Sequence, residues 1–270
     1  MPQPGCEAAS PGGAGPGEPW WITFFRGDLY TEGDTDFGDK TLTEAMVDCA
    51  ASLLDQGPGT RLLDLACGPG RHSLPLSRRG FLVTGVDTAE AYLEAARRQA
   101  DTGKARFLRA DMRDLSALAD GSFDAVASLH TSFGFFPARA ENLRVLREAR
   151  RVLVPGGRLL LDVLNRDWFL RQAPEPAPPG DYVVRSYDER PSAVYLHEER
   201  FDPVTSRITW TITETAGRRS ATASYRTYSA HELAELAGEA GFRVTALFGD
   251  YDRSPFHLTA PHVICLADAA

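Results

Sequence analysis

Arg61-Leu-Leu-Asp-Leu-Ala-Cys-Gly-Pro-Gly-Arg-His72 is the stretch that decides the fold. Leu62, Leu63 and Leu65 surround a single acid and predict a short strand that is buried on both faces. The chain then breaks at a glycine turn and resumes with a helical pattern from Arg71. A strand that enters a glycine turn and then a helix is typical of the first half of a nucleotide-binding βαβ unit.

The residues around the glycines distinguish two kinds of nucleotide site. A dinucleotide site reads G-x-G-x-x-G and seats a pyrophosphate on the helix N-terminus. Here no third glycine follows Gly68 and Gly70 at that place, and Asp64 precedes them. A carboxylate repels a pyrophosphate but suits an ammonium group, while the two glycines let a ligand lie directly on the backbone.

Further acids end the next strands of the pattern. Phe81–Asp87 reads as a second buried strand, and Asp87 follows the glycines by about 20 residues, where a carboxylate accepts ribose hydroxyls. A third strand over 105–110 leads into Asp111-Met112. The fourth and fifth predicted strands lie in Phe123–Leu129 and in Arg151–Asp162, which contains a Pro-Gly-Gly turn.

These motifs, which run in register from Thr60 to Asp162, resemble the class I S-adenosylmethionine (SAM) methyltransferases. The resemblance implies that Asp64 and the glycine turn hold the methionine part of SAM, that Asp87 holds the ribose, and that Asp111 with Met112 holds the adenine. The full set of cofactor contacts that we expect is Asp64, Ala66, Gly68, Gly70, Asp87, Thr88, Asp111, Met112 and Leu129.

Strands that alternate with helices predict an α/β fold with a parallel sheet. We expect a Rossmann-like, doubly wound, seven-stranded sheet with an antiparallel last strand. Ser229-Ala-His-Glu232 is a capping box that opens the last helix. It precedes the two closing strands, Phe242–Phe248 and Pro261–Ala267.

Residues 165–228 interrupt the alternation of strands and helices. Four segments of alternating polarity follow a Pro-rich loop and predict an inserted antiparallel β-sheet. Residues 1–19, rich in Pro, Gly, Ala and Ser, predict a disordered tail. We therefore expect a SAM-binding core with an N-terminal lid over 20–164, the insert over 165–228, and completion of the core over 229–270.

The composition narrows the class of partner. The 270 residues carry a net charge of −8 and a sequence pI of about 5.3, which disfavours a nucleic-acid substrate. The four cysteines are scattered and the histidines do not pair with them at zinc spacing, so we expect reduced thiols and no metal. The N-terminus lacks a signal-peptide layout and no apolar run could span a bilayer, which predicts a cytoplasmic protein without a membrane partner.

His130-Thr-Ser-Phe-Gly-Phe-Phe-Pro137 follows the fourth strand, where ligands bind in open α/β sheets. His130 is the candidate general base, because imidazole titrates near neutral pH. It could equally form local hydrogen bonds or pack near the cofactor, and methyl transfer does not always need a base. Ser132 and Phe135 are candidate substrate contacts. The Asn/Asp-Pro-Pro-Tyr/Phe motif of many DNA and protein N-methyltransferases is absent from this loop, which favours a small-molecule substrate.

Other candidate substrate contacts lie outside this loop. The aromatic segment Trp20–Tyr30 is either a helix that packs on the core or a lid over the pocket, and Tyr30 is its candidate contact. The insert either roofs the active site, with Tyr225 as a contact, or serves as a scaffold or homodimer surface. The polar loop Gly249–Phe256, with Tyr251, is either solvated or helps to close the substrate site.

The sequence thus predicts a SAM-dependent methyltransferase that transfers a methyl group to a nitrogen or oxygen of a small molecule by in-line displacement. A nicotinamide-dependent Rossmann oxidoreductase is the alternative enzyme class, and the missing third glycine and Asp111-Met112 argue against it. A non-catalytic SAM-binding regulatory protein stays open at this point.

Overall fold

The computed structural model describes residues 19–33, 38–54, 57, 59–100, 103–172, 182–191 and 193–270. The tail predicted over residues 1–19 therefore lies outside the described residues, apart from Pro19. None of the helices in these ranges combines the length and the apolar character that a membrane span requires.

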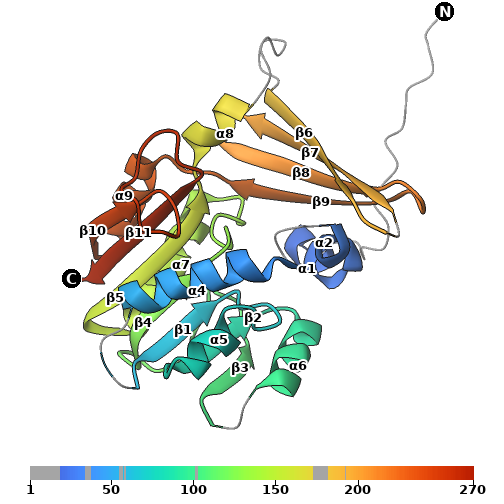
Figure 1. The fold of residues 1–270 in the computed structure, drawn as a ribbon. Coiled ribbons are helices and arrows are strands. Elements are labelled where there is room, and N and C mark those ends of the chain that lie inside the picture. Colours follow the sequence, from blue (N-terminus) through green and yellow to red (C-terminus); the bar gives the residue numbers. More distant parts are fainter. Residues whose placement is uncertain are drawn as a thin grey trace, which may run out of the picture.

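A seven-stranded sheet forms the centre of the molecule, in the order β10-β11-β5-β4-β1-β2-β3 (Figure 1). Strands β1 to β5 are parallel to one another, and β11 runs antiparallel to both β5 and β10. This arrangement confirms the predicted doubly wound sheet with an antiparallel last strand. The strands are β1 (Arg61–Leu65), β2 (Leu82–Asp87), β3 (Ala105–Arg109), β4 (Phe123–Ser128), β5 (Leu153–Leu164), β10 (Phe242–Phe248) and β11 (His262–Ala269).

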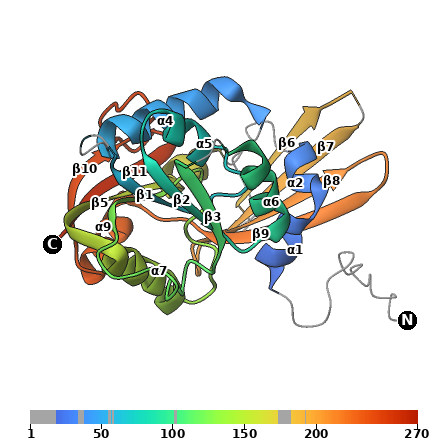
Figure 2. The same ribbon diagram turned by 90° about the horizontal axis from the view of Figure 1, so that it is seen from below.

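Helices cover both faces of this sheet (Figure 2). One face carries α4 (Lys40–Leu54), α5 (Ser73–Arg78) and α6 (Glu90–Gln99), and the other carries α7 (Arg139–Val152) and α9 (Ala230–Glu239). Leu62 of β1 packs toward α4, whereas Leu63 packs toward α7. Adjacent residues of a strand point to opposite faces, so a strand between two helical layers carries apolar residues on both, as β1 does with Leu62, Leu63 and Leu65.

A separate four-stranded antiparallel sheet lies beyond the carboxyl ends of the central strands (Figure 1). It consists of β6 (Tyr182–Glu189), β7 (Val194–Asp202), β8 (Arg207–Glu214) and β9 (Arg219–Arg226), and α8 (Arg166–Gln172) precedes it. The predicted inserted antiparallel sheet is therefore confirmed.

The aromatic N-terminal segment forms two short helices, α1 (Trp20–Arg26) and α2 (Asp28–Gly33), between the two sheets. Phe24 and Leu29 are buried against the inserted sheet, not against the central one, and pack there on Tyr195, Ile212 and Ala223. Glu32 adds polar contacts, because it accepts hydrogen bonds from Arg219 Nη2 at 2.8 Å and from Tyr195 Oη at 3.3 Å. These two helices and the inserted sheet thus share one apolar core.

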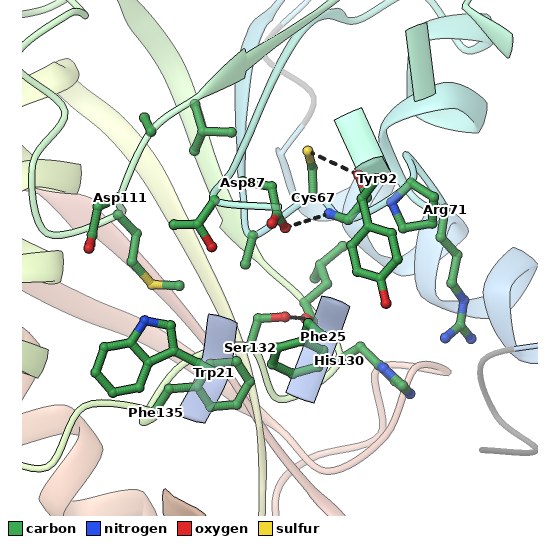
Figure 3. Close-up of a pocket in the computed structure, with 18 of the residues that line it drawn as sticks. Trp21, Phe25, Cys67, Arg71, Asp87, Tyr92, Asp111, His130, Ser132 and Phe135 are labelled. Atoms are coloured by element: carbon green, nitrogen blue, oxygen red, sulfur yellow. Dashed lines mark hydrogen bonds between the residues drawn. The ribbon is translucent and has the colours of Figure 1, made fainter. Parts of the chain in front are cut away.

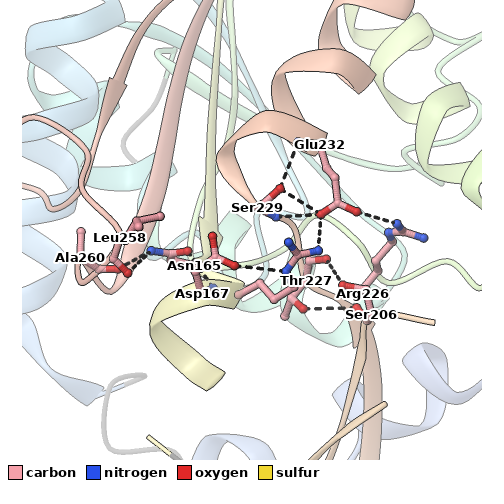
Figure 4. Close-up of polar contacts among 10 residues, drawn as sticks. Asn165, Asp167, Ser206, Arg226, Thr227, Ser229, Glu232, Leu258 and Ala260 are labelled. Carbon is pink, nitrogen blue, oxygen red and sulfur yellow. Dashed lines mark hydrogen bonds and ion pairs between the residues drawn. The ribbon is translucent and has the colours of Figure 1, made fainter. Parts of the chain in front are cut away.

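The chain enters and leaves the insert at neighbouring points of the central domain (Figure 4). Asn165, at the entry, pairs its backbone with Tyr228, at the exit. The buried side chain of Asn165 also donates a hydrogen bond to the carbonyl of Ala260 at 2.8 Å. Entry, exit and the loop before β11 are thereby fixed to one another.

Glu232, in the first turn of α9, is the acid at this junction (Figure 4). It completes the predicted capping box. The Glu232 carboxylate accepts from the backbone N–H of Ser229 at 3.0 Å, and Ser229 Oγ accepts from the backbone N–H of Glu232 at 3.2 Å. It also pairs with Arg166 before the insert and with Arg226 at its end. The partners of one carboxylate thus come from the entry and exit of the insert and from the helix that follows.

We predict that Glu232→Ala lowers the free energy of unfolding by about 1–2 kcal/mol, because it removes a capping residue and the ion pairs with Arg166 and Arg226. Glu235→Ala is the matched control on the same helix. Its side chain is 64% exposed, and its loss should change stability by less than about 0.5 kcal/mol. Urea denaturation of both variants measures the difference, and equal losses would contradict this role of the junction.

Candidate cofactor and acceptor site

A cavity of about 880 Å³, partly open to solvent, lies beyond the carboxyl ends of β1 to β4 and beneath α1 and α2. Figure 3 shows its two sides, with Asp111, Asp87 and Cys67 on one and Trp21, Phe135 and His130 on the other. Its lining contains these predicted site residues: Ala66, Gly68, Asp87, Thr88, Asp111, Met112 and Leu129 from the cofactor set, and Tyr30, His130, Ser132 and Phe135.

Asp87 joins the turns that follow the first two strands. Its carboxylate accepts hydrogen bonds from the N–H of Gly68 at 2.9 Å and from the N–H of Ala89 at 2.8 Å. Burial raises the pKa of Asp87, although these N–H groups favour its charged form. The carboxylate therefore lies fixed in the cavity wall, where it can accept hydroxyl groups of a ligand.

The two glycines of the turn have different functions. Gly68 has φ +51°, and an added Cβ would meet nothing within 4 Å, so this position lies open toward the cavity. Gly70 does not line the cavity. A Cβ there would lie 3.0 Å from Leu74 Cγ and 3.2 Å from the Cβ of Ala96. Gly70 thus lets α5 and α6 pack closely behind the turn.

Asp64 does not reach the cavity wall. It is 1% exposed, and Ser73 Oγ donates a hydrogen bond to its carboxylate at 2.5 Å. Burial raises the pKa of Asp64 to about 7, against the effect of the Ser73 hydrogen bond. Asp64 therefore lies outside the cavity lining, and its hydrogen bond joins β1 to the start of α5.

Asp111 lies at the opposite end of the cavity from Cys67 of the glycine turn, with Trp21 near it (Figure 3), and Met112 also lines the cavity. Arg113 holds the Asp111 carboxylate through Nε at 3.0 Å and Nη2 at 2.6 Å. Partial burial opposes the charge of Asp111, but these hydrogen bonds lower its pKa overall. The Arg113 guanidinium also lies 4.2 Å from the ring centroid of Phe136, which ties this acid to the aromatic side of the cavity.

Arg71 and His72 line the cavity and were not predicted as site residues. Arg71 donates from Nε to Thr43 Oγ1 at 2.7 Å, whereas its Nη1 is buried without a hydrogen-bond partner in the described part of the chain. His72 Nε2 is also buried without a hydrogen-bond partner among the described residues. Burial, together with the nearby charge of Arg71, lowers the pKa of His72 to about 3. In the sequence, the only indication of a role for Arg71 was its position as a basic residue directly after the glycine turn.

The loop after β4 begins with an unusual backbone. His130 and Thr131 both have φ +54°, a region that non-glycine residues rarely adopt. Asp162 of β5 holds this turn, because its carboxylate accepts the N–H of His130 at 2.8 Å and its carbonyl accepts the N–H of Thr131 at 3.1 Å. The position of the His130 side chain at the cavity therefore depends on a residue of the next strand.

Tyr251 lies behind this loop and not in the cavity lining, which corrects its predicted contact with the substrate. Its hydroxyl donates to the Asp162 carboxylate at 2.9 Å, and His262 Nδ1 lies 3.1 Å from the other carboxylate oxygen. Asp162 is 0% exposed, and although burial opposes its charge, His262 and these hydrogen bonds lower its pKa. The loop over 249–256 thus stabilises the site from behind.

Tyr225 is also outside the cavity lining, contrary to its predicted substrate contact. It is buried in the apolar cluster between α8 and the inserted sheet, with Phe169, Phe201 and Ile208. Its hydroxyl donates to Glu199 at 3.3 Å. Tyr225 points to the same face of the sheet as Ala223, which packs on Phe24, but it lies where Phe169 of α8 covers that face.

The inserted sheet nevertheless contributes to the site through hydrogen bonds to the loop after β4. Arg226 donates its N–H to the carbonyl of Gly134 at 2.8 Å, and a Cβ at Gly134 would lie 2.4 Å from the carbonyl oxygen of Arg226. Arg207 of β8 donates from Nη2 to the carbonyl of Phe135 at 3.1 Å and from Nη1 to that of Phe136 at 3.0 Å. The insert thereby fixes the aromatic loop that lines the cavity.

Comparison with known proteins identifies the family. A family model described as a methyltransferase domain matches residues 62–157, which hold the glycine turn and the three acids. The putative methyltransferase YqeM of Bacillus subtilis is 31% identical over 213 residues, which are 76% of this chain and 82% of that protein. This chain belongs to the class I SAM-dependent methyltransferases. Membership in this family excludes the nicotinamide-dependent oxidoreductase that the sequence left as the alternative enzyme class.

Solved structures show the same fold for this methyltransferase. The CcbJ methyltransferase from Streptomyces caelestis superposes with a TM-score of 0.77 at 22% identity, over 93% of this chain and 98% of that one. CalS10 of Micromonospora echinaspora, described as an amino pentose methyltransferase with SAM bound, gives a TM-score of 0.58 at 24% identity, over 86% and 93%. The cofactor of this methyltransferase is S-adenosylmethionine.

We predict that Tyr251→Phe lowers the free energy of unfolding by about 1.5–3 kcal/mol, because the buried Asp162 carboxylate loses a donor. Tyr228→Phe is the matched control. The Tyr228 hydroxyl is buried but finds no hydrogen-bond partner among the described residues, so its removal should cost less than about 0.5 kcal/mol. Chemical denaturation measures both, and a Tyr251 variant as stable as the control would refute the proposed support of the loop.

Proposed function

We propose that this methyltransferase modifies a nitrogen or oxygen of a small molecule. The cavity is lined mainly by apolar and aromatic side chains with a few polar groups, as small-molecule sites are, and α1, α2 and the aromatic loop enclose it on the side away from the sheet. The net charge of −8 supports an acceptor other than a nucleic acid. When bound, SAM supplies a methyl group on a sulfonium, from which the acceptor atom displaces it in line.

The cavity offers a suitable group for each part of SAM. Asp87 would accept the ribose hydroxyls, and Asp111 with Met112 would bind the adenine, covered by Trp21. The open turn at Gly68 would lie along the methionine part. The buried Nη1 of Arg71, which has no hydrogen-bond partner among the described residues, is the group available to the methionine carboxylate.

The protein contributes position and enclosure to the reaction. The strained turn at His130 is held by Asp162 and directs the imidazole into the cavity, where it can receive a proton or orient the acceptor. Because the methyl group is already activated, alignment of the acceptor can account for a large part of the rate. Exclusion of water by α1 and α2 protects that alignment.

Asp87→Ala should weaken SAM binding by at least about tenfold, since a ribose diol in a buried site loses its carboxylate acceptor. Calorimetric titration measures the affinity, and a thermal unfolding scan checks that the turn still folds. Asp114→Ala is the control, because Asp114 is an exposed acid on the segment after β3, outside the cavity lining. Unchanged SAM affinity in Asp87→Ala would refute the placement of the ribose.

The assignment of Arg71 can be tested with decarboxylated SAM, which lacks the methionine carboxylate. The wild-type protein should bind SAM at least about tenfold more tightly than this analogue, because the carboxylate receives a charge-assisted hydrogen bond. Arg71→Met should abolish that preference by weakening SAM alone. Arg78→Met, an exposed arginine of α5, is the control. A preference that survives in Arg71→Met would place the carboxylate elsewhere.

A further inference from the structure

We infer that the acceptor is a planar aromatic molecule with its nucleophilic hydroxyl or amine at one edge. This inference rests on the proposed function and specifies its substrate class. It comes from the part of the cavity that remains after the cofactor groups are assigned. That part is lined by Phe25, Tyr30 and Phe135, together with His130 and Ser132.

The three aromatic rings form one continuous wall. The centroids of Phe25 and Phe135 lie 5.4 Å apart with an interplanar angle of 32°, and Tyr30 meets Phe25 edge-on at 5.1 Å. Figure 3 shows Phe25 and Phe135 on the same side of the cavity as Ser132 and His130, across from Asp87. A flat ring that lies on this wall would therefore have both a stacking surface and a polar group at its edge.

The wall is held in place by groups behind it. Trp20 packs edge-on against Phe135 with ring centroids 5.5 Å apart. The ring centroids of Phe24 and of Trp210, in the inserted sheet, lie 5.7 Å apart. The carbonyl of Phe135 is fixed by Arg207. A surface that is rigid before the ligand arrives loses little conformational freedom on binding, so it selects ligands of matching shape.

Polar side chains meet this part of the cavity at one edge of the aromatic wall. Figure 3 shows the Tyr92 side chain pointing toward Ser132 and His130, and the Ser132 hydroxyl already donates to the carbonyl of Leu129 at 2.8 Å. A polyhydroxylated acceptor such as a sugar would leave several of its own groups without partners, and each such group weakens binding. An aromatic acceptor with a single nucleophilic group matches this distribution of polar and apolar surface.

The test compares an aromatic ligand with its saturated analogue and with a polyhydroxylated amine. The protein is loaded with S-adenosylhomocysteine, and 2-naphthol, decahydro-2-naphthol and glucosamine are titrated separately by calorimetry. Because stacking adds to simple burial, 2-naphthol should bind about fivefold more tightly than its saturated analogue, and glucosamine more weakly than both. Phe25→Leu and Phe135→Leu, on different elements, should each reduce this preference to less than about twofold.

Tyr187→Leu is the matched control, because Tyr187 is an aromatic side chain on the exposed surface of the inserted sheet and is 69% exposed. It should leave the preference unchanged. Equal or tighter binding of decahydro-2-naphthol or glucosamine, or no binding of 2-naphthol to the loaded protein, overturns the aromatic acceptor while the proposed function stands. Failure of S-adenosylhomocysteine and SAM to bind would instead overturn the proposed function itself.

Discussion

The hydrogen bonds of the Asp87 carboxylate are the constraint on which the site depends. One oxygen accepts the N–H of Gly68 after β1, and the other accepts the N–H of Ala89 after β2. Two turns that are distant in sequence are thereby held at one edge of the sheet. Parallel pairing of β1 with β2 brings them to the same level, and the shared acid then fixes their separation.

The three acids of the pattern have different surroundings, although they look equivalent in the sequence. Asp64 is buried beneath the turn and bonded to Ser73, Asp87 lies in the cavity wall, and Asp111 is held by Arg113. The sequence pattern could not separate these roles, because it records only that each acid comes at or near the end of a strand. Burial and the nearest donor decide which carboxylate can accept a ligand.

The insert and the N-terminal helices act on the site as one unit. They share an apolar core around Phe24 and Ile212, and Glu32 pairs with Arg219 across their contact. Through Arg207 and Arg226 the same sheet holds the loop after β4. The part of the chain that departs from the SAM-binding pattern thus shapes the aromatic side of the cavity, whereas the central sheet supplies the side with Asp87 and Asp111.

The sequence by itself determined the central sheet, the inserted sheet, the capping box at Ser229 and the strand-end residues Asp87, Asp111 and Met112. These features are local, since apolar periodicity, glycine turns and caps act within a few residues of the chain. Only the tertiary structure decided that Arg71 lines the cavity and that Tyr225 and Tyr251 do not. The direction of a side chain depends on contacts with residues far away in sequence, such as Tyr251 with Asp162, and no local pattern encodes them.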